Sequence, residues 1–283
     1  MRIHHLNCGT DCPLGGALFD GKSRGPLGEV VGHCLLIETD AHGLVLVDTG
    51  YGLKDVAHPH RSPARIPRFF RGLLNIRLRE EETAARQIER LGFRREDVRH
   101  IVLTHLDFDH AGGIEDFPAA AVHVMQAEYD AATRPHAGYI PNARYRRPQW
   151  NEVEDWRLYG SGGEGWFGFD AVRDLDGLPP EILLVPLSGH TWGHAGVAVH
   201  QDDGKWLLQA GDAYFYRGEV RNPERHCTPG LRAYQTMMET HREQRLANQA
   251  RVRRLSVEHA GEVRVVCSHD PVEFERCVAG RPL

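Results

Sequence analysis

The chain has 283 residues, of which 41% are hydrophobic and 26% charged, and its formal net charge is −5. This composition is typical of a globular protein with one sizeable core, and the negative charge argues against a general nucleic-acid binder. The N-terminus lacks the apolar run of a signal peptide, and no stretch has the length of a membrane span. We therefore expect a cytoplasmic protein with no stable membrane insertion and with reduced cysteines.

Apolar runs bounded by turn residues predict strands, in chain order, at 2–8, 31–38, 44–48, 98–103, 121–125, 182–185, 196–200, 206–210 and 263–267. Helical spacing and stop signals predict helices at 80–91, 126–132, 231–255 and 271–278. The residues alone thus predict a mixed α/β protein.

The predicted strand at 98–103 leads into a short segment with four potential metal ligands within six positions: His105, Asp107, Asp109 and His110. Alternate residues of an extended segment share a face, so positions 105, 107 and 109 can converge on one point. His110 then turns toward a second point nearby. Such a cluster of imidazoles and carboxylates suits one or two divalent transition metals.

Ligand-type residues recur after three later predicted strands. His190 and His194 follow the strand at 182–185, Asp212 follows the strand at 206–210, and His269 follows the last strand. All of them can therefore lie on one rim of a sheet-based scaffold.

In order and spacing, these motifs resemble those of the metallo-β-lactamase superfamily of binuclear metal hydrolases. The pattern H-x-H-x-D-H, G-H-T-x-G-H, Asp and a C-terminal His corresponds here to His105-x-Asp107-x-Asp109-His110, His190, Asp212 and His269. Residues 45–50 match the family's early strand and turn, so the resemblance covers nearly the full length. It implies an αββα four-layer sandwich, which we expect to form a single domain over residues 1–283.

The resemblance also implies two divalent metal ions, with zinc as the first expectation and manganese or iron as alternatives. The first ion would be held by His105, position 107 and His190, the second by Asp109, His110 and His269, and Asp212 would bridge them. Two adjacent cations lower the pKa of a shared water, so the implied nucleophile is a bridging hydroxide.

Two positions depart from the family pattern. Asp107 stands where a second histidine is usual, so it either binds the first ion, which would widen its tolerance toward manganese or iron as well as zinc, or lies beside a weakly held ion. The position of a tyrosine that assists the substrate in related lactonases falls on Phe215. Tyr214 or Tyr216 would then have to substitute, unless both merely pack or line the pocket.

Asp48, at the end of an early strand, either orients a ligand histidine or caps its turn.

Two further segments stand out. Residues 134–180 hold eight of the 23 aromatic residues in a loop-rich insertion, which either lines an apolar pocket over the metals or anchors itself on the core. Residues 58–79 carry six arginines and no acid. They could contact an anionic substrate, a membrane surface or a partner subunit; the resemblance to lactonases favours a pocket wall and a homodimer contact.

The resemblance is closest in style to N-acyl-homoserine lactonases. It implies a hydrolase that opens a lactone or other ester of a small molecule with an apolar part, while Asp109 or a metal-bound water returns a proton to the leaving group. The alternatives are another hydrolase of the same fold (a β-lactamase, a glyoxalase II-like thioesterase or a phosphodiesterase), a di-iron redox protein, or a non-catalytic metal-binding protein.

Overall fold

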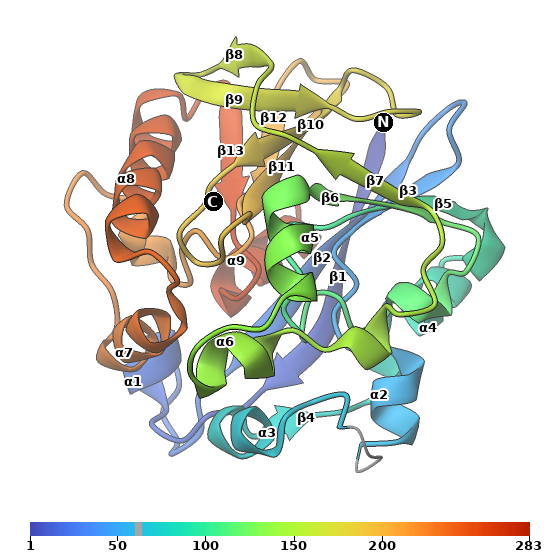
Figure 1. Cartoon of the computed structure of the whole chain (residues 1–283). Helices are drawn as coiled ribbons and strands as arrows, with labels where there is room; N and C mark the ends of the chain where they lie inside the picture. Colours follow the sequence, from blue (N-terminus) through green and yellow to red (C-terminus); the bar gives the residue numbers. More distant parts are fainter. Residues whose placement is uncertain (60–63) are drawn as a thin grey trace.

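The computed structural model describes residues 1–59 and 64–283, apart from the side chains of 170–173. The first of two sheets has the strand order β4-β1-β2-β3-β5-β6-β7 (Figure 1). Its strands are β1 (Arg2–Asp11), β2 (Val30–Glu38), β3 (Leu44–Val47), β4 (Ile76–Arg77), β5 (Val98–Val102), β6 (Ala121–Met125) and β7 (Trp156–Tyr159). Pairing is antiparallel among β4, β1, β2 and β3, and parallel from β3 to β7.

The second sheet has the order β13-β12-β11-β10-β9-β8 and is antiparallel except for the β12–β13 pair. Its strands are β8 (Glu164–Trp166), β9 (Phe169–Asp174), β10 (Ile182–Pro186), β11 (Ala195–His200), β12 (Trp206–Gln209) and β13 (Val263–Val266).

Helices flank the two sheets, some on their faces and others at one edge (Figure 1). They are α1 (Ala17–Asp20), α2 (Leu53–Ala57), α3 (Arg68–Leu74), α4 (Ala84–Arg90), α5 (Gln126–Thr133), α6 (Tyr139–Arg144), α7 (Pro229–Met238), α8 (Arg242–Glu258) and α9 (Pro271–Val278). Single turns of 3-10 helix lie at Glu80–Glu82, Arg95–Asp97, Ile114–Asp116, Arg147–Gln149 and Arg217–Glu219. None of the helices in the described ranges is long and apolar enough to cross a membrane.

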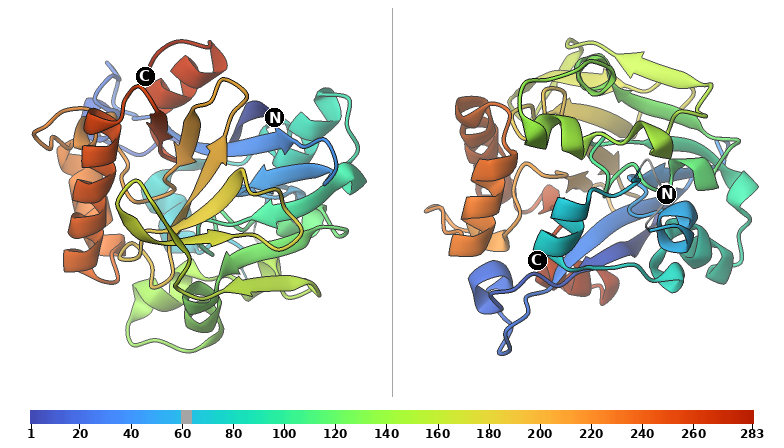
Figure 2. Two further views of the ribbon diagram at one scale, coloured as in Figure 1. Left: turned by 90° about the horizontal axis from the view of Figure 1, so that it is seen from above. Right: turned by 60° about the horizontal axis from the view of Figure 1, so that its bottom comes forward.

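The four layers follow from strands that are buried on both faces. In β2, Leu35 and Ile37 enter the core between the sheets, whereas Cys34 and Leu36 enter the core beneath α4. On the far side, Val252 and Leu255 of α8 pack on the outer face of the second sheet. The views in Figure 2 accordingly place α8 and α4 on opposite sides of the paired sheets. Uninterrupted apolar runs such as residues 34–37 reflect this double burial, and the predicted αββα sandwich is confirmed.

The predicted helix over 231–255 is two helices. Helix α7 ends at Met238, and α8 begins at Arg242 with the His241 side chain accepting a hydrogen bond from the Gln244 N–H. Between them the N–H groups of Thr240 and His241 donate to the carbonyl of Gly189, in the loop after β10. A contact across about 50 residues therefore breaks a helix that local spacing predicts to be continuous.

The aromatic segment 134–180 is more regular than predicted, because it contains α6 and supplies β7, β8 and β9 to the two sheets. Trp150 packs into the core beneath α4, Tyr159 into the core between the sheets, and Trp166 against the second sheet. These aromatic side chains anchor the segment, which was one of the two alternatives. Because no part of it stands apart from the sheets, we propose that residues 1–283 form one domain.

The arginine-rich segment 58–79 forms α3 and β4, with residues 60–63 outside the described part of the chain. Phe70 and Leu74 of α3 are buried, whereas Phe69 and Leu73 are 45% and 39% exposed. Phe69 also meets the exposed ring of Tyr139 at 5.9 Å. The segment thus presents an apolar outer face.

Candidate metal centre

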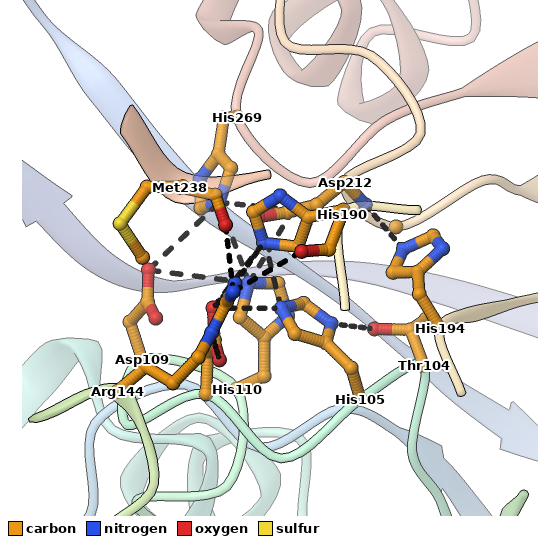
Figure 3. Close-up of polar contacts among 12 residues, drawn as sticks. Thr104, His105, Asp109, His110, Arg144, His190, His194, Asp212, Met238 and His269 are labelled. Atoms are coloured by element: carbon orange, nitrogen blue, oxygen red, sulfur yellow. Dashed lines mark hydrogen bonds and ion pairs between the residues drawn. The ribbon is translucent and has the colours of Figure 1, made fainter. Parts of the chain in front are cut away.

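Four loops, which follow β5, β10, β12 and β13, bring the predicted metal ligands together (Figure 3). Their donor atoms form overlapping groups, each within 4.8 Å, made of His105, Asp107, Asp109, His110, His190, Asp212 and His269. All of these side chains are buried except that of Asp109, which is 12% exposed. Residues far apart in the sequence therefore form one cluster of imidazoles and carboxylates.

The second site comprises Asp109, His110, His269 and one oxygen of Asp212. The Nε2 atoms of His110 and His269 are 3.3 Å apart, and Asp212 Oδ1 lies 3.4 and 3.1 Å from them. Asp109 Oδ2 completes the group at 3.9 and 3.8 Å from the same nitrogens. Ligands about 2.0–2.1 Å from one tetrahedral ion lie about 3.3 Å apart, so this donor set fits a divalent transition metal.

The first site comprises His105, Asp107, His190 and the other oxygen of Asp212. His190 Nε2 lies 3.2 Å from both Asp107 Oδ2 and Asp212 Oδ2. His105 Nε2 lies 3.4 and 3.7 Å from the same two oxygens. The spacing alone would suit an ion, but a fifth side chain, that of Arg144, reaches these atoms.

Arg144, at the end of α6, is fully buried. Its Nε and Nη2 donate to the two oxygens of Asp107 at 2.6 and 2.7 Å, and Nη2 lies 2.9 Å from His190 Nε2. Its Nη1 donates to the carbonyl oxygens of His190 and Met238 at 3.1 and 2.7 Å. A guanidinium therefore sits within the first donor set.

Three of the four cluster histidines are oriented by oxygen atoms behind them. Nδ1 of His110 donates to Asp48, Nδ1 of His105 to the Thr104 hydroxyl, and Nδ1 of His269 to the Val31 carbonyl, at 2.8–2.9 Å. Each Nε2 lone pair is thereby directed into the cluster, as metal ligation requires. The tautomers follow from this hydrogen-bond network.

Asp48 is one of the few non-glycine residues with a positive φ, 54°, a conformation that costs free energy unless other contacts enforce it. Its carboxylate accepts hydrogen bonds from the N–H and hydroxyl of Thr104 and from His110. Of the two roles weighed for Asp48, the structure supports the orientation of ligand histidines.

Glu128 joins two of the ligand loops. Its carboxylate accepts hydrogen bonds from the N–H groups of Leu106 and Gly193, each at 3.0 Å. A Cβ on Gly193 would lie 2.1 Å from the Glu128 backbone nitrogen, so only glycine fits there. His194, in the same loop, accepts from the Asp212 N–H at 2.8 Å and so positions the carboxylate that both sites share.

The histidines of the cluster differ in charge. Burial opposes protonation of His110 and His269, but the nearby carboxylates, Asp212 first, raise their pKa values to about 10 and 9, so metal binding there would release protons. Burial lowers the pKa of His105 well below its usual range, and His110 adds to this effect. Burial opposes ionisation of Asp212, yet the neighbouring His269, His110 and His190 hold its pKa well below the usual range. Metal binding needs deprotonated ligands, so little proton release opposes it at His105 and Asp212.

A narrow pocket opens onto the second site. It is lined by Asp11, Phe19, Val30, Leu74, Asp109, Phe215, Leu231, Tyr234 and His269. Phe215 stacks on His269 with ring centres 4.9 Å apart, and Tyr234 meets Phe215 edge-on at 5.8 Å. The wall is mainly apolar, and the polar groups gather at the metal end.

Asp11 lies in this pocket and accepts a hydrogen bond from the Tyr51 hydroxyl at 3.2 Å. Burial, followed by the charge of Asp109, raises the pKa of Asp11 to about 8. A carboxyl group with this pKa can hold a proton near neutral pH.

Tyr214 and Tyr216 are not brought to the cluster. The fully buried Tyr214 donates its hydroxyl to Glu273 at 2.8 Å and packs beneath α8. Tyr216 lies along a separate groove with Arg217 and His226, and its ring is stacked by the Arg217 guanidinium at 4.6 Å. Of the alternatives for these two tyrosines, the structure supports the one in which both merely pack away from the cluster.

Sequence reasoning missed Arg144, Glu128, Asp11 and Tyr234. No local motif marks any of them, because each joins the site from an element far along the chain. For Arg144 one signal exists: a carboxylate at position 107, where imidazole is usual, adds a buried negative charge that needs a partner.

Comparison with known proteins identifies the family of the chain. The sequence model of the metallo-beta-lactamase superfamily matches residues 27–254. A probable metallo-hydrolase of Mycobacterium tuberculosis is 44% identical over 273 residues, which span 96% of this chain and 81% of that protein. An N-acyl homoserine lactonase of Bacillus cereus is 35% identical over 182 residues, 64% of this chain and 63% of that one.

Among solved structures, an N-acyl homoserine lactone hydrolase with N-hexanoyl-L-homoserine at its catalytic metal centre has a TM-score of 0.70. It is 19% identical, with coverage of 97% of this chain and 95% of that one. A dizinc quorum-quenching lactonase has a TM-score of 0.62 at 16% identity, with coverage of 95% and 87%. At these identities the likeness concerns the fold. The chain thus belongs to the metallo-β-lactamase superfamily and is one of its metallo-hydrolases.

Proposed function

We propose that this metallo-hydrolase opens lactones of small molecules that carry an apolar chain, with N-acyl-homoserine lactones as the first candidates. The observation that carries the proposal is the pocket, in which an apolar wall leads to Asp109 and His269. The lining side chains nearly fill this pocket, so it would have to widen to admit a substrate. An acyl chain would then bury its apolar surface against Phe215, Leu231 and Leu74, at roughly 0.8 kcal/mol for each buried methylene. The likeness to lactonases in sequence and fold supports the same choice.

The reaction adds one water to the lactone carbonyl and breaks the ring C–O bond to give a hydroxy acid. A divalent ion held by Asp109, His110 and His269 would lower the pKa of a water molecule and polarise a carbonyl oxygen. The chain itself orients the ligands, since hydrogen bonds to Asp48 and Thr104 fix the imidazole rings of His110 and His105. We assign Asp109, the most accessible carboxylate of the cluster, to return the proton to the ring oxygen as it leaves.

Asp212, with one oxygen facing each site, is proposed as the residue that keeps the two donor sets in a fixed relation. The metal is proposed to be zinc, with manganese or iron as alternatives, because the second site combines imidazole and carboxylate donors. The sequence predicts two ions, and loading of the first site depends on Arg144.

Turnover of matched substrates tests this function. N-acyl-homoserine lactones of increasing acyl length should be opened, with kcat/KM rising with chain length as the apolar wall is filled. Nitrocefin, S-lactoylglutathione and bis-p-nitrophenyl phosphate represent the other hydrolases of this fold and should react poorly. Asp212→Asn is the inactive control, and Tyr214→Phe, away from the pocket, is the active one. Hydrolysis of one of the three other substrates with no lactone opened would replace the proposal.

We further propose that the protein acts in the cytoplasm, where opening such lactones would quench quorum signals, and that it forms a homodimer. The exposed apolar side chains of Phe69, Leu73 and Tyr139 support the dimer. Light scattering of the wild type and of Phe69→Ser would test it: a dimeric wild type and a weakened variant are expected, and a monomeric wild type would contradict it.

A further inference from the structure

Arg144 is held beside the first site by the main chain. The Phe108 N–H donates to the Arg144 carbonyl at 3.1 Å, and Asp107 forms an isolated antiparallel bridge with Tyr145. An isolated β-bridge therefore joins the loop after β5 to the end of α6, and the Arg144 side chain lies next to Asp107.

The guanidinium uses the same atoms that a first ion would need. Asp107 Oδ2 and His190 Nε2 belong to the first donor set, and both lie within 3.0 Å of Arg144 Nη2. An imidazole nitrogen has one lone pair, so Nε2 of His190 accepts from Arg144 or binds a metal, but not both. The guanidinium does not deprotonate in proteins and cannot itself become a ligand.

The orientation of His190 differs from that of the other cluster histidines. His105, His110 and His269 donate from Nδ1 to an oxygen behind the ring, as ligand histidines usually do. Nδ1 of His190 is buried and has no hydrogen-bond partner among the described residues. Arg144 therefore holds this imidazole at Nε2, on the side of the cluster, and its Nδ1 lacks the hydrogen bond that usually orients a ligand histidine.

Charge and access lead to the same conclusion. Arg144 neutralises Asp107, so a second divalent ion would face a guanidinium with only the shared Asp212 as a counter-charge. Arg144 has no route to solvent, because its side chain is fully buried and its Nη1 is bound by the carbonyls of His190 and Met238. Displacing it would leave an unpaired buried charge.

We propose that the Arg144 guanidinium takes the place of the first metal ion, so that the protein holds one divalent ion, at the second site. Asp107 is then the counter-ion of Arg144, and Arg144 is a positioning residue that fixes Asp107, His190 and the carbonyl of Met238. His105, whose buried Nε2 has no hydrogen-bond partner in the described part of the chain, still forms a donor group with His110 and Asp212 and stays within reach of the single ion.

Metal content, measured without substrate, tests this assignment. Protein produced with excess zinc and dialysed against a weak chelator should contain one zinc ion per chain, as measured by inductively coupled plasma mass spectrometry. The double substitution Asp107→His with Arg144→Leu, which restores the usual imidazole and removes the guanidinium, should raise the content to two. Arg144→Lys, which keeps the charge, and Arg157→Leu, which removes an exposed arginine, should both remain at one.

Two zinc ions per wild-type chain, retained with similar affinity, would overturn the proposal, whether or not the variants fold. A folded double variant, checked by circular dichroism, that still holds one ion would overturn it as well. The inference rests on the proposed function only in that both concern the same site, and it does not depend on the substrate. One ion without lactone turnover would refute the proposed substrate alone, and two ions with turnover would refute this inference alone.

Discussion

Replacing Asp107 with asparagine keeps the shape of the side chain and removes the counter-charge of Arg144. The ion pair is bidentate, with 2.6 and 2.7 Å contacts, and both side chains are at most 3% exposed. Breaking a buried pair by removing one partner costs about 3–5 kcal/mol, because the remaining charge stays buried. For 283 residues the entropy of unfolding is roughly 0.6 kcal/mol/K, so the melting temperature should fall by roughly 5–8 °C.

The chain offers a matched control in Asp155 and Arg157. Their contacts have the same bidentate geometry, at 2.7 and 2.9 Å, but the two side chains are 51% and 44% exposed. An exposed pair contributes about 0–1 kcal/mol, so Asp155→Asn should lower the melting temperature by at most about 2 °C.

Differential scanning calorimetry in EDTA compares the proteins without any contribution from bound metal. The reasoning is refuted if Asp107→Asn melts within 2 °C of the wild type, or if the two asparagine variants lose the same stability. Either result would mean that the Arg144 charge is compensated by groups other than Asp107.

Three further predictions follow from the site and its supports. His269→Ala should weaken metal binding by more than about 100-fold in a chelator competition, since loss of an outer partner alone costs 10–100-fold; unchanged affinity would remove His269 from the ligands. Gly193→Ala should cost about 1–3 kcal/mol in urea unfolding through its clash with Glu128, whereas Gly261→Ala, with nothing within 4 Å, should be nearly neutral; equal costs would contradict the close packing. Burial lowers the pKa of His123 from 6.5 to about 3. The unfolded state therefore binds the extra proton, and the contribution of His123 to stability is present above pH 6.5 and is lost as the pH falls toward 3. The stability gap between wild type and His123→Gln should shrink between pH 7 and pH 4.5, and a constant gap would contradict the shift.

The members of the candidate metal cluster could be predicted to lie together because each follows an apolar run in the sequence. A strand end places its next residues at a sheet edge, so strand-end histidines and aspartates signal a shared rim without any knowledge of long-range contacts. Helix α7, whose residues carry the spacing behind the predicted helix over 231–255, and the strands buried on both faces could be predicted in the same way, since burial on one or both faces leaves a recognisable pattern.

What could not be predicted depends on contacts between distant segments. Arg144, Arg146 and Arg147 look alike in the sequence, yet only Arg144 meets Asp107, 37 positions away. Tyr214 is next to the family's tyrosine position but faces Glu273, whereas Tyr234, on a helix some twenty residues later, lines the pocket. Chain proximity to a motif is thus a poor guide to which side chain reaches the substrate.

The bond from Arg144 to the Met238 carbonyl has a consequence for how this enzyme can change. Met238 ends α7, the helix whose Leu231 and Tyr234 form one wall of the pocket. The Arg144 guanidinium therefore connects this wall of the pocket to the loops that carry the candidate metal cluster. Substitutions that shift α7 and so reshape the pocket would also displace Asp107 and His190 through Arg144. A change in the shape of the pocket would therefore also change the geometry of the metal cluster, and the two would have to adapt together.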